Sequence, residues 1–135
     1  MNSFEQIKNM NFDALVLEGG SLKCAFTAGI LDVLMDSDFP EFKYYYGVSS
    51  GSMAMSYLLS KQRSNFIKVT RALVENPSFI SYRNSFSQQG LMNLDFLQGY
   101  VHDTYPFDEE AADRNSEGKK VCIVATDHHS GKPHY

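Results

Sequence analysis

One pentapeptide constrains this chain more than any other feature. Residues 47–51 read G-V-S-S-G, fit the pattern G-x-S-x-G, and stand between a strand-like and a helix-like segment. In a nucleophile elbow a serine occupies a tight strand-to-helix turn, and glycines on either side leave room where strand and helix meet. The following helix directs its N–H groups and positive dipole end at the serine. The pattern predicts Ser49 as a nucleophile between Gly47 and Gly51; an ordinary turn without chemistry is the alternative.

The segments on both sides of the pentapeptide alternate between strand and helix patterns. Residues 14–17 form a short, continuous apolar run typical of a buried strand in a parallel sheet, and three tyrosines favour a second strand over 43–46. Apolar residues at helical spacing predict a helix over 22–35, and the helix after the pentapeptide lacks a polar face, which predicts burial on nearly all sides. Further elements are expected at helices 63–74, 94–101 (capped by Asn93) and 106–112, strand 120–126, turn 127–131, and a strand from 132.

This alternation predicts an α/β fold, a layered structure with a mainly parallel sheet flanked by helices. The C-terminal hairpin has a second strand that has barely begun at Tyr135, which predicts a fold that is incomplete at the C-terminus. Residues 1–11 are expected to be an N-terminal extension, and residues 12–135 to form the domain.

A second glycine-rich turn lies between the first strand and the first helix. Residues 18–24 read E-G-G-S-L-K-C, so backbone N–H groups can point inward at a helix N-terminus. Binding of a nucleotide phosphate would use the same physics. Neither G-x-G-x-x-G nor G-x-x-x-x-G-K-S/T is present, however, and no acidic residue completes a dinucleotide-binding unit. Nucleotide binding therefore ranks below ester hydrolysis.

The two turns, in this order and spacing, carry a family resemblance. Segments 14–34 and 44–59 resemble the opening of a patatin-like phospholipase domain, with a G-G-G-x-R/K-G oxyanion loop followed by a G-x-S-x-G elbow; segment 121–135 is similar to that family's strand and hairpin. The resemblance implies a patatin-like fold, of which residues 12–135 are the N-terminal portion. It also implies a Ser–Asp dyad that hydrolyses lipid acyl esters without a catalytic histidine, metal or cofactor. By position, Ser49 would be the nucleophile, and the oxyanion loop would comprise Gly19, Gly20, Ser21, Leu22 and the basic residue Lys23.

The chain departs from the family pattern at three points. Ser21 replaces the third glycine, and its Cβ opposes the positive φ that the loop requires. Cys24 replaces the glycine after the basic residue; core packing is favoured over a reactive thiol, because apolar surroundings raise a thiol pKa. The family's aspartate belongs to a D-G-G/A motif, and no Asp-Gly occurs here. Asp127 is a candidate base, but an aspartate that begins a turn is the favoured interpretation.

Because a serine without a base is a poor nucleophile, the resemblance implies an aspartate beyond Tyr135. The competing interpretation is a truncated or degenerate relative that binds lipid or a partner protein without turnover. Acyl transfer, in which an alcohol replaces water, is a third possibility that these motifs do not separate from hydrolysis.

Composition excludes several other classes. A net charge of −4 and a pI of about 5.5 argue against a partner held through nucleic-acid phosphates. The chain shows no signal-peptide pattern and no apolar run of membrane-spanning length, and its two cysteines are too few for a disulfide framework. We therefore expect a cytoplasmic protein, and the family resemblance implies a lipid ester as its partner.

Charge and histidine clusters leave two further alternatives. Five basic residues and one acid occupy 61–83, whereas six acids and one base occupy 103–117. Solvated faces of opposite sign are the favoured interpretation, and a weakly cationic patch on an anionic lipid surface is the other. His128, His129 and His134 suggest a metal site, but their spacing does not suit a ligand set, so a solvated turn is favoured.

Overall fold

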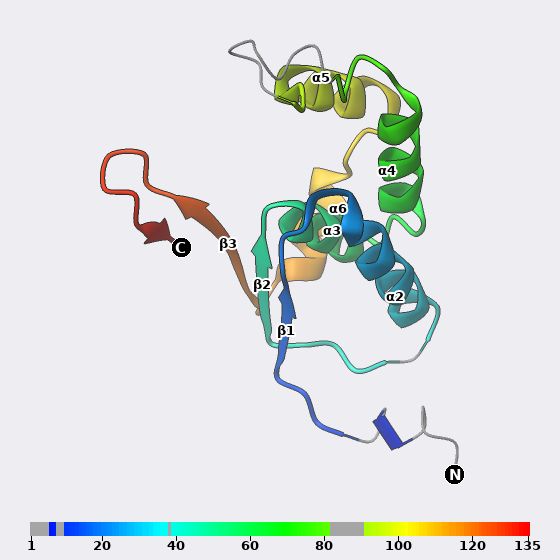
Figure 1. Cartoon of the computed structure of the whole chain (residues 1–135). Helices are drawn as coiled ribbons and strands as arrows, with labels where there is room; N and C mark the ends of the chain where they lie inside the picture. The colour runs from blue at the N-terminus through cyan, green and yellow to red at the C-terminus, as the bar shows by residue number, and fades with distance from the viewer. Residues whose placement is uncertain (1–5, 8–9, 38, 82–90) are drawn as a thin grey trace.

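A computed structural model describes residues 6–7, 10–37, 39–81 and 91–135, and its fold is α/β, as predicted (Figure 1). Strands β1, β2 and β3 pair in parallel, and β4 pairs with β3 in antiparallel orientation. The elements follow the predicted alternation: β1 (Ala14–Leu17), the 3₁₀ helix η1 (Ser21–Lys23), α2 (Cys24–Asp36), β2 (Tyr44–Val48), α3 (Ser50–Leu59), α4 (Asn65–Glu75), α5 (Leu94–Thr104), α6 (Glu109–Ser116), β3 (Lys120–Thr126) and β4 (Pro133–His134).

The sheet is buried on one face only within the described part of the chain. Leu17 and Tyr45 are buried beneath the helices, whereas Val16 is 69% exposed and Tyr46 and Val48 are also exposed. The prediction of a fully buried first strand is therefore wrong here, because the described helices pack against the opposite face. The tyrosine run divides in the same way, since only its central residue packs in the core.

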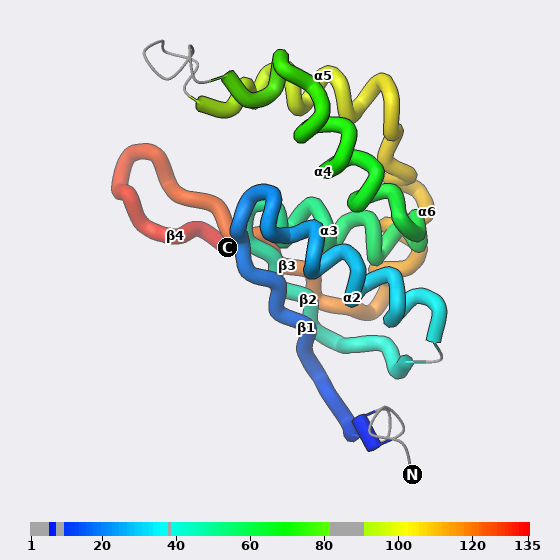
Figure 2. The backbone as a smooth tube through the Cα atoms, turned by 45° about the vertical axis from the view of Figure 1, so that its right-hand side comes forward, coloured from blue at the N-terminus to red at the C-terminus, as the bar shows by residue number. Residues whose placement is uncertain are grey.

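Helix α3 is the central helix, as its apolar sequence predicted. None of its residues is exposed, and Met55 is completely buried. The helix packs against α2, α4, α6 and β2 (Figure 2). This central position fixes the N-terminus of α3, where the predicted nucleophile lies.

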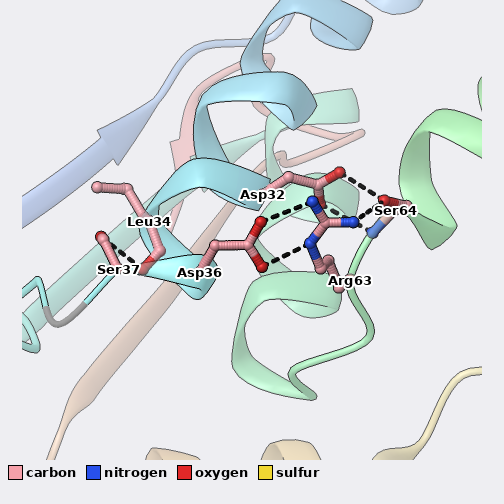
Figure 3. Close-up of polar contacts among 6 residues, drawn as sticks. All are labelled: Asp32, Leu34, Asp36, Ser37, Arg63 and Ser64. Carbon is pink, nitrogen blue, oxygen red and sulfur yellow. Dashed lines mark hydrogen bonds and ion pairs between the residues drawn. The ribbon is translucent and has the colours of Figure 1, made fainter.

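Two acidic side chains of α2 hold the segment that leads into α4 (Figure 3). The carboxylate of Asp32, which is 9% exposed, accepts hydrogen bonds from the N–H and the hydroxyl of Ser64, both at 2.8 Å. Asp36 accepts two hydrogen bonds from the Arg63 guanidinium, both at 2.6 Å. This pairing lowers the pKa of Asp36. Ser64 has a φ of 61°, a left-handed conformation that these contacts stabilise at the start of α4.

Several predicted bounds shift by a few residues for local reasons. The helix predicted over 106–112 begins at Glu109, because the Asp108 side chain accepts the N–H of Ala111 and caps it. Asn93 caps α5 as predicted and accepts the N–H of Phe96. No helix in the described part of the chain is both long enough and apolar enough to cross a membrane.

Candidate active site

The pentapeptide forms a sharp turn between β2 and α3. Ser49 has a φ of 52° and a ψ of −129°, a strained backbone conformation for a residue with a Cβ. The two flanking glycines lie where the backbones nearly touch. A Cβ on Gly47 would lie 2.7 Å from the Cα of Ser52, and a Cβ on Gly51 would lie 2.4 Å from the carbonyl oxygen of Glu18. The turn therefore has the geometry that the G-x-S-x-G pattern predicts.

The second glycine-rich turn lies directly against the first. A Cβ on Gly19 would lie 3.0 Å from the Cβ of Ser49, so the loop backbone passes beside the predicted nucleophile. Ser21 has a φ of 52°, which means that a serine occupies the left-handed conformation expected to favour glycine. The folded chain accommodates this strain at Ser21, which is the first residue of the 3₁₀ helix η1.

The N–H groups of the predicted oxyanion loop differ in whether they are already bonded, and that of Lys23 donates to the carbonyl oxygen of Gly20 at 3.1 Å. The N–H of Gly20 donates to the Ser50 hydroxyl at 3.2 Å and is therefore occupied in this conformation. In contrast, the N–H groups of Ser21 and Leu22 have no hydrogen-bond partner among the described residues. Free N–H groups at the first turn of a helix are suited to bind negative charge. The loop therefore offers these two amides, rather than Gly20, as candidates for stabilising an oxyanion.

An apolar cavity of about 300 Å³ opens beside Ser49. Its polar lining comes from the two turns, through Ser21, Ser49 and Ser50, and from Thr70 of α4. Apolar side chains of α3, α4, α5 and the segments beside them form its other walls: Leu22, Met53, Phe66, Val69, Leu73, Phe79, Met92, Leu94 and Leu97. A cavity of this size and lining has room for a hydrocarbon chain beside Ser49.

The sequence did not predict which residues would form this cavity. Helices α4 and α5 lie side by side in both views (Figures 1 and 2), although residues 76–93 separate them along the chain. The apolar face predicted for the 63–74 helix was the one sequence feature that pointed to the cavity. Phe66, Val69 and Leu73 belong both to that face and to the cavity lining. What could not be predicted is that this face would meet α5 beside the elbow.

Two of the charged candidates do not join the nucleophile. Lys23 is exposed, and no described residue forms an ion pair with it. Asp127 begins a turn, as the favoured interpretation had it: its carboxylate accepts N–H groups from Ser130 at 3.1 Å and His129 at 2.7 Å. These hydrogen bonds lower the pKa of Asp127. Within the described residues the hydroxyl of Ser49 has no hydrogen-bond partner, so no base is in place there.

Two of the histidines lie in an exposed turn, and three basic residues of the segment 61–83 are paired with acids. His128 and His129 lie in the exposed turn after β3, and no group of three potential metal ligands occurs among the described residues. In the predicted cationic segment, Lys61 pairs with Glu41 at 3.6 Å, Arg63 with Asp36, and Arg71 with Glu75 at 2.9 Å. Arg83 lies outside the described residues. Pairing with acids weakens the positive potential of this segment.

Comparisons with known proteins identify a family for this chain. The model of the patatin-like phospholipase family matches residues 15–130. The chain is also similar to the uncharacterized protein YjjU of Escherichia coli (strain K12), with 29% identity over 123 residues. That match covers 90% of this chain and 34% of the relative, so the chain spans about a third of the relative's length. No solved structure matches the chain.

Proposed function

Because the chain belongs to the patatin-like phospholipase family, we propose that it carries the nucleophile of a lipid acyl hydrolase, with Ser49 in that role. One observation carries the proposal: Ser49 occupies a strained strand-to-helix turn at the edge of an apolar cavity of about 300 Å³. The turn exposes the hydroxyl, and the cavity supplies a place for the hydrocarbon part of an ester. The substrate class that fits both is a lipid ester.

In the proposed reaction the Ser49 oxygen attacks the carbonyl carbon of the ester. The carbonyl oxygen then carries negative charge, which the free N–H groups of Ser21 and Leu22 and the N-terminal end of α3 stabilise. A base accepts the hydroxyl proton and returns it to the departing alcohol, which leaves an acyl-enzyme. Water attacks the acyl-enzyme, releases the fatty acid and restores the hydroxyl of Ser49.

We propose that the base is an aspartate outside residues 1–135. Two observations support this: Asp127 is engaged in its own turn, and the chain spans about a third of the relative that it matches. We further propose that the substrate is presented at a lipid surface and that the protein acts in the cytoplasm. Cys24 and Cys122 are both free thiols, which suits a reducing compartment.

The proposal is tested by measuring the hydrolysis of p-nitrophenyl esters. The protein is used in its natural form, isolated from its source. Ser49→Ala should lower kcat by a factor of at least about 10³, whereas Ser78→Ala, which removes an exposed hydroxyl after α4, should leave it unchanged. Esters of medium-chain acids should react faster than acetate, because their chains fill the cavity. Full activity in Ser49→Ala would remove this serine from the mechanism.

The absence of a base among the described residues favours one second candidate, a protein that binds lipid without turnover. Co-sedimentation with phosphatidylcholine vesicles, together with no ester hydrolysis above that of Ser49→Ala, would support that candidate. Turnover that depends on Ser49 would exclude it.

A further inference from the structure

Beneath the glycine-rich loop, three side-chain and backbone contacts form a continuous chain. The N–H of Gly20 donates to the Ser50 hydroxyl at 3.2 Å. The Ser50 hydroxyl lies 3.0 Å from the thiol of Cys24, and that thiol donates to the carbonyl oxygen of Glu18 at 3.6 Å. The family resemblance assigns no role to Ser50, and the apolar sequence around Cys24 favours only a packing role for that residue.

One assignment of the hydrogens uses every donor of this chain. A thiol and a hydroxyl each have one hydrogen to donate. In this assignment the Cys24 hydrogen is directed to Glu18, and the Ser50 hydrogen is shared with the Cys24 sulfur. The Ser50 oxygen then accepts from Gly20, so every donor is used once. The four groups thus form one directed network without an unpaired hydrogen.

The network ties the loop to both helices of the site. Glu18 and Gly20 belong to the loop, Cys24 is the first residue of α2, and Ser50 is the first residue of α3 and follows Ser49 directly. Cys24 is 2% exposed, so the network is shielded from competing water on that side. Ser21, the first residue of η1, directly follows the tethered Gly20, and its φ of 52° requires support from its surroundings.

We propose that Ser50 and Cys24 are positioning residues for the proposed hydrolysis. They hold the loop in the conformation in which the N–H groups of Ser21 and Leu22 remain free beside Ser49. The inference rests on the proposed function, because it concerns the same oxyanion site. It differs from a packing role for Cys24, since packing depends on the volume of this side chain and positioning depends on its ability to donate and accept a hydrogen bond.

The proposal is tested by measuring the kinetics of four variants, each made in the natural form of the protein. Ser50→Ala and Cys24→Ala break the network and should each lower kcat about tenfold with KM nearly unchanged, since a misplaced donor affects the transition state more than binding. Cys24→Ser keeps a group that donates and accepts, and should restore most of the rate. Ser56→Ala is the matched control, because the Ser56 hydroxyl bonds only within α3, to the carbonyl of Ser52.

The rate of labelling by a fluorophosphonate separates failure of this proposal from failure of the proposed function. If Ser49→Ala abolishes labelling while Ser50→Ala labels as fast as the unchanged protein, the positioning role is wrong and the nucleophile stands. If Ser49→Ala still labels at the original rate, the proposed function is wrong. A Cys24→Ser rate as low as that of Cys24→Ala would also overturn the inference, because it would show that volume alone matters. Should Ser50→Ala fail to fold, this pair of Cys24 variants still decides the question.

Discussion

The two glycine-rich turns of the site each hold a serine at a positive φ but are stabilised by different means. Each places a serine at a φ of 52°, Ser21 in the loop and Ser49 in the elbow. In the elbow, close backbone contacts at Gly47 and Gly51 leave no space for a side chain. In the loop, only Gly19 among the described glycines is close to the elbow, where its Cβ would lie 3.0 Å from the Cβ of Ser49. A Cβ on Gly20 would meet no described atom nearer than 3.5 Å, and hydrogen bonds hold this part of the loop instead.

This difference indicates which part of the site is fixed by the fold itself. The elbow lies between the core helix α3 and the sheet, so its shape follows from backbone packing. The loop depends on a few polar contacts, each of which contributes about 1 kcal/mol. Substitutions in the elbow should therefore reduce stability, whereas substitutions that disturb the position of the loop should mainly change activity.

The largest effect is expected from Gly51→Ala. Its Cβ would lie 2.4 Å from the Glu18 carbonyl oxygen and 2.6 Å from that of Leu17, and neither backbone group can move away cheaply. The free energy of unfolding, measured by urea denaturation, should fall by about 3 kcal/mol. Gly29→Ala is the control, because a Cβ at this helical position meets no described atom within 4 Å. This substitution should raise the free energy of unfolding by about 1 kcal/mol. Equal stability of the two variants would contradict the packing account of the elbow.

An intermediate effect is expected from Gly19→Ala, where the two turns touch. The new Cβ would lie 3.0 Å from the Cβ of Ser49 and 3.1 Å from the carbonyl oxygen of Val48. A shift of a few tenths of an ångström relieves these contacts, so we expect a loss of about 1 kcal/mol in unfolding free energy and a larger proportional loss in ester turnover. Unchanged turnover would mean that the loop does not need to lie against Ser49.

The smallest effect is expected from Ser21→Gly. Glycine removes the cost of a left-handed conformation but adds backbone entropy to the unfolded chain, so the net gain in unfolding free energy should be about 0.5 kcal/mol. Because the loop N–H remains, turnover should be retained. Ser37→Gly, at a φ of −109°, has no strain to relieve and should not gain stability. A loss of stability in Ser21→Gly would show that the contact of its hydroxyl with the Met92 sulfur at 3.5 Å matters more than the strain.

The sequence predicted the parts of this site that depend on local pattern. Alternating apolar runs predicted the order of strands and helices, and glycine spacing predicted both turns with Ser49 between Gly47 and Gly51. The need for a positive φ in the loop was also predicted, and Ser21 adopts it despite its Cβ.

Features that depend on tertiary contacts could not be predicted. The hydrogen bond between Cys24 and Ser50 joins residues that are 26 positions apart, and neither residue type predicts contact with the other. The exposure of Val16 depends on which face of the sheet the helices cover, which an apolar run alone does not reveal. For the same reason the cavity walls from α4 and α5 were missed.

Mass spectrometry of the fluorophosphonate-treated protein tests the central claim most directly. Cleavage after Lys43 and Lys61 gives a peptide of residues 44–61, which contains Ser49 together with four other serines. The account predicts that the added mass lies on Ser49 alone and disappears in Ser49→Ala, while Ser50→Ala is still labelled on Ser49 at a lower rate. Two results would contradict the assignment of Ser49 as the nucleophile: modification of another serine, or no modification of the natural protein.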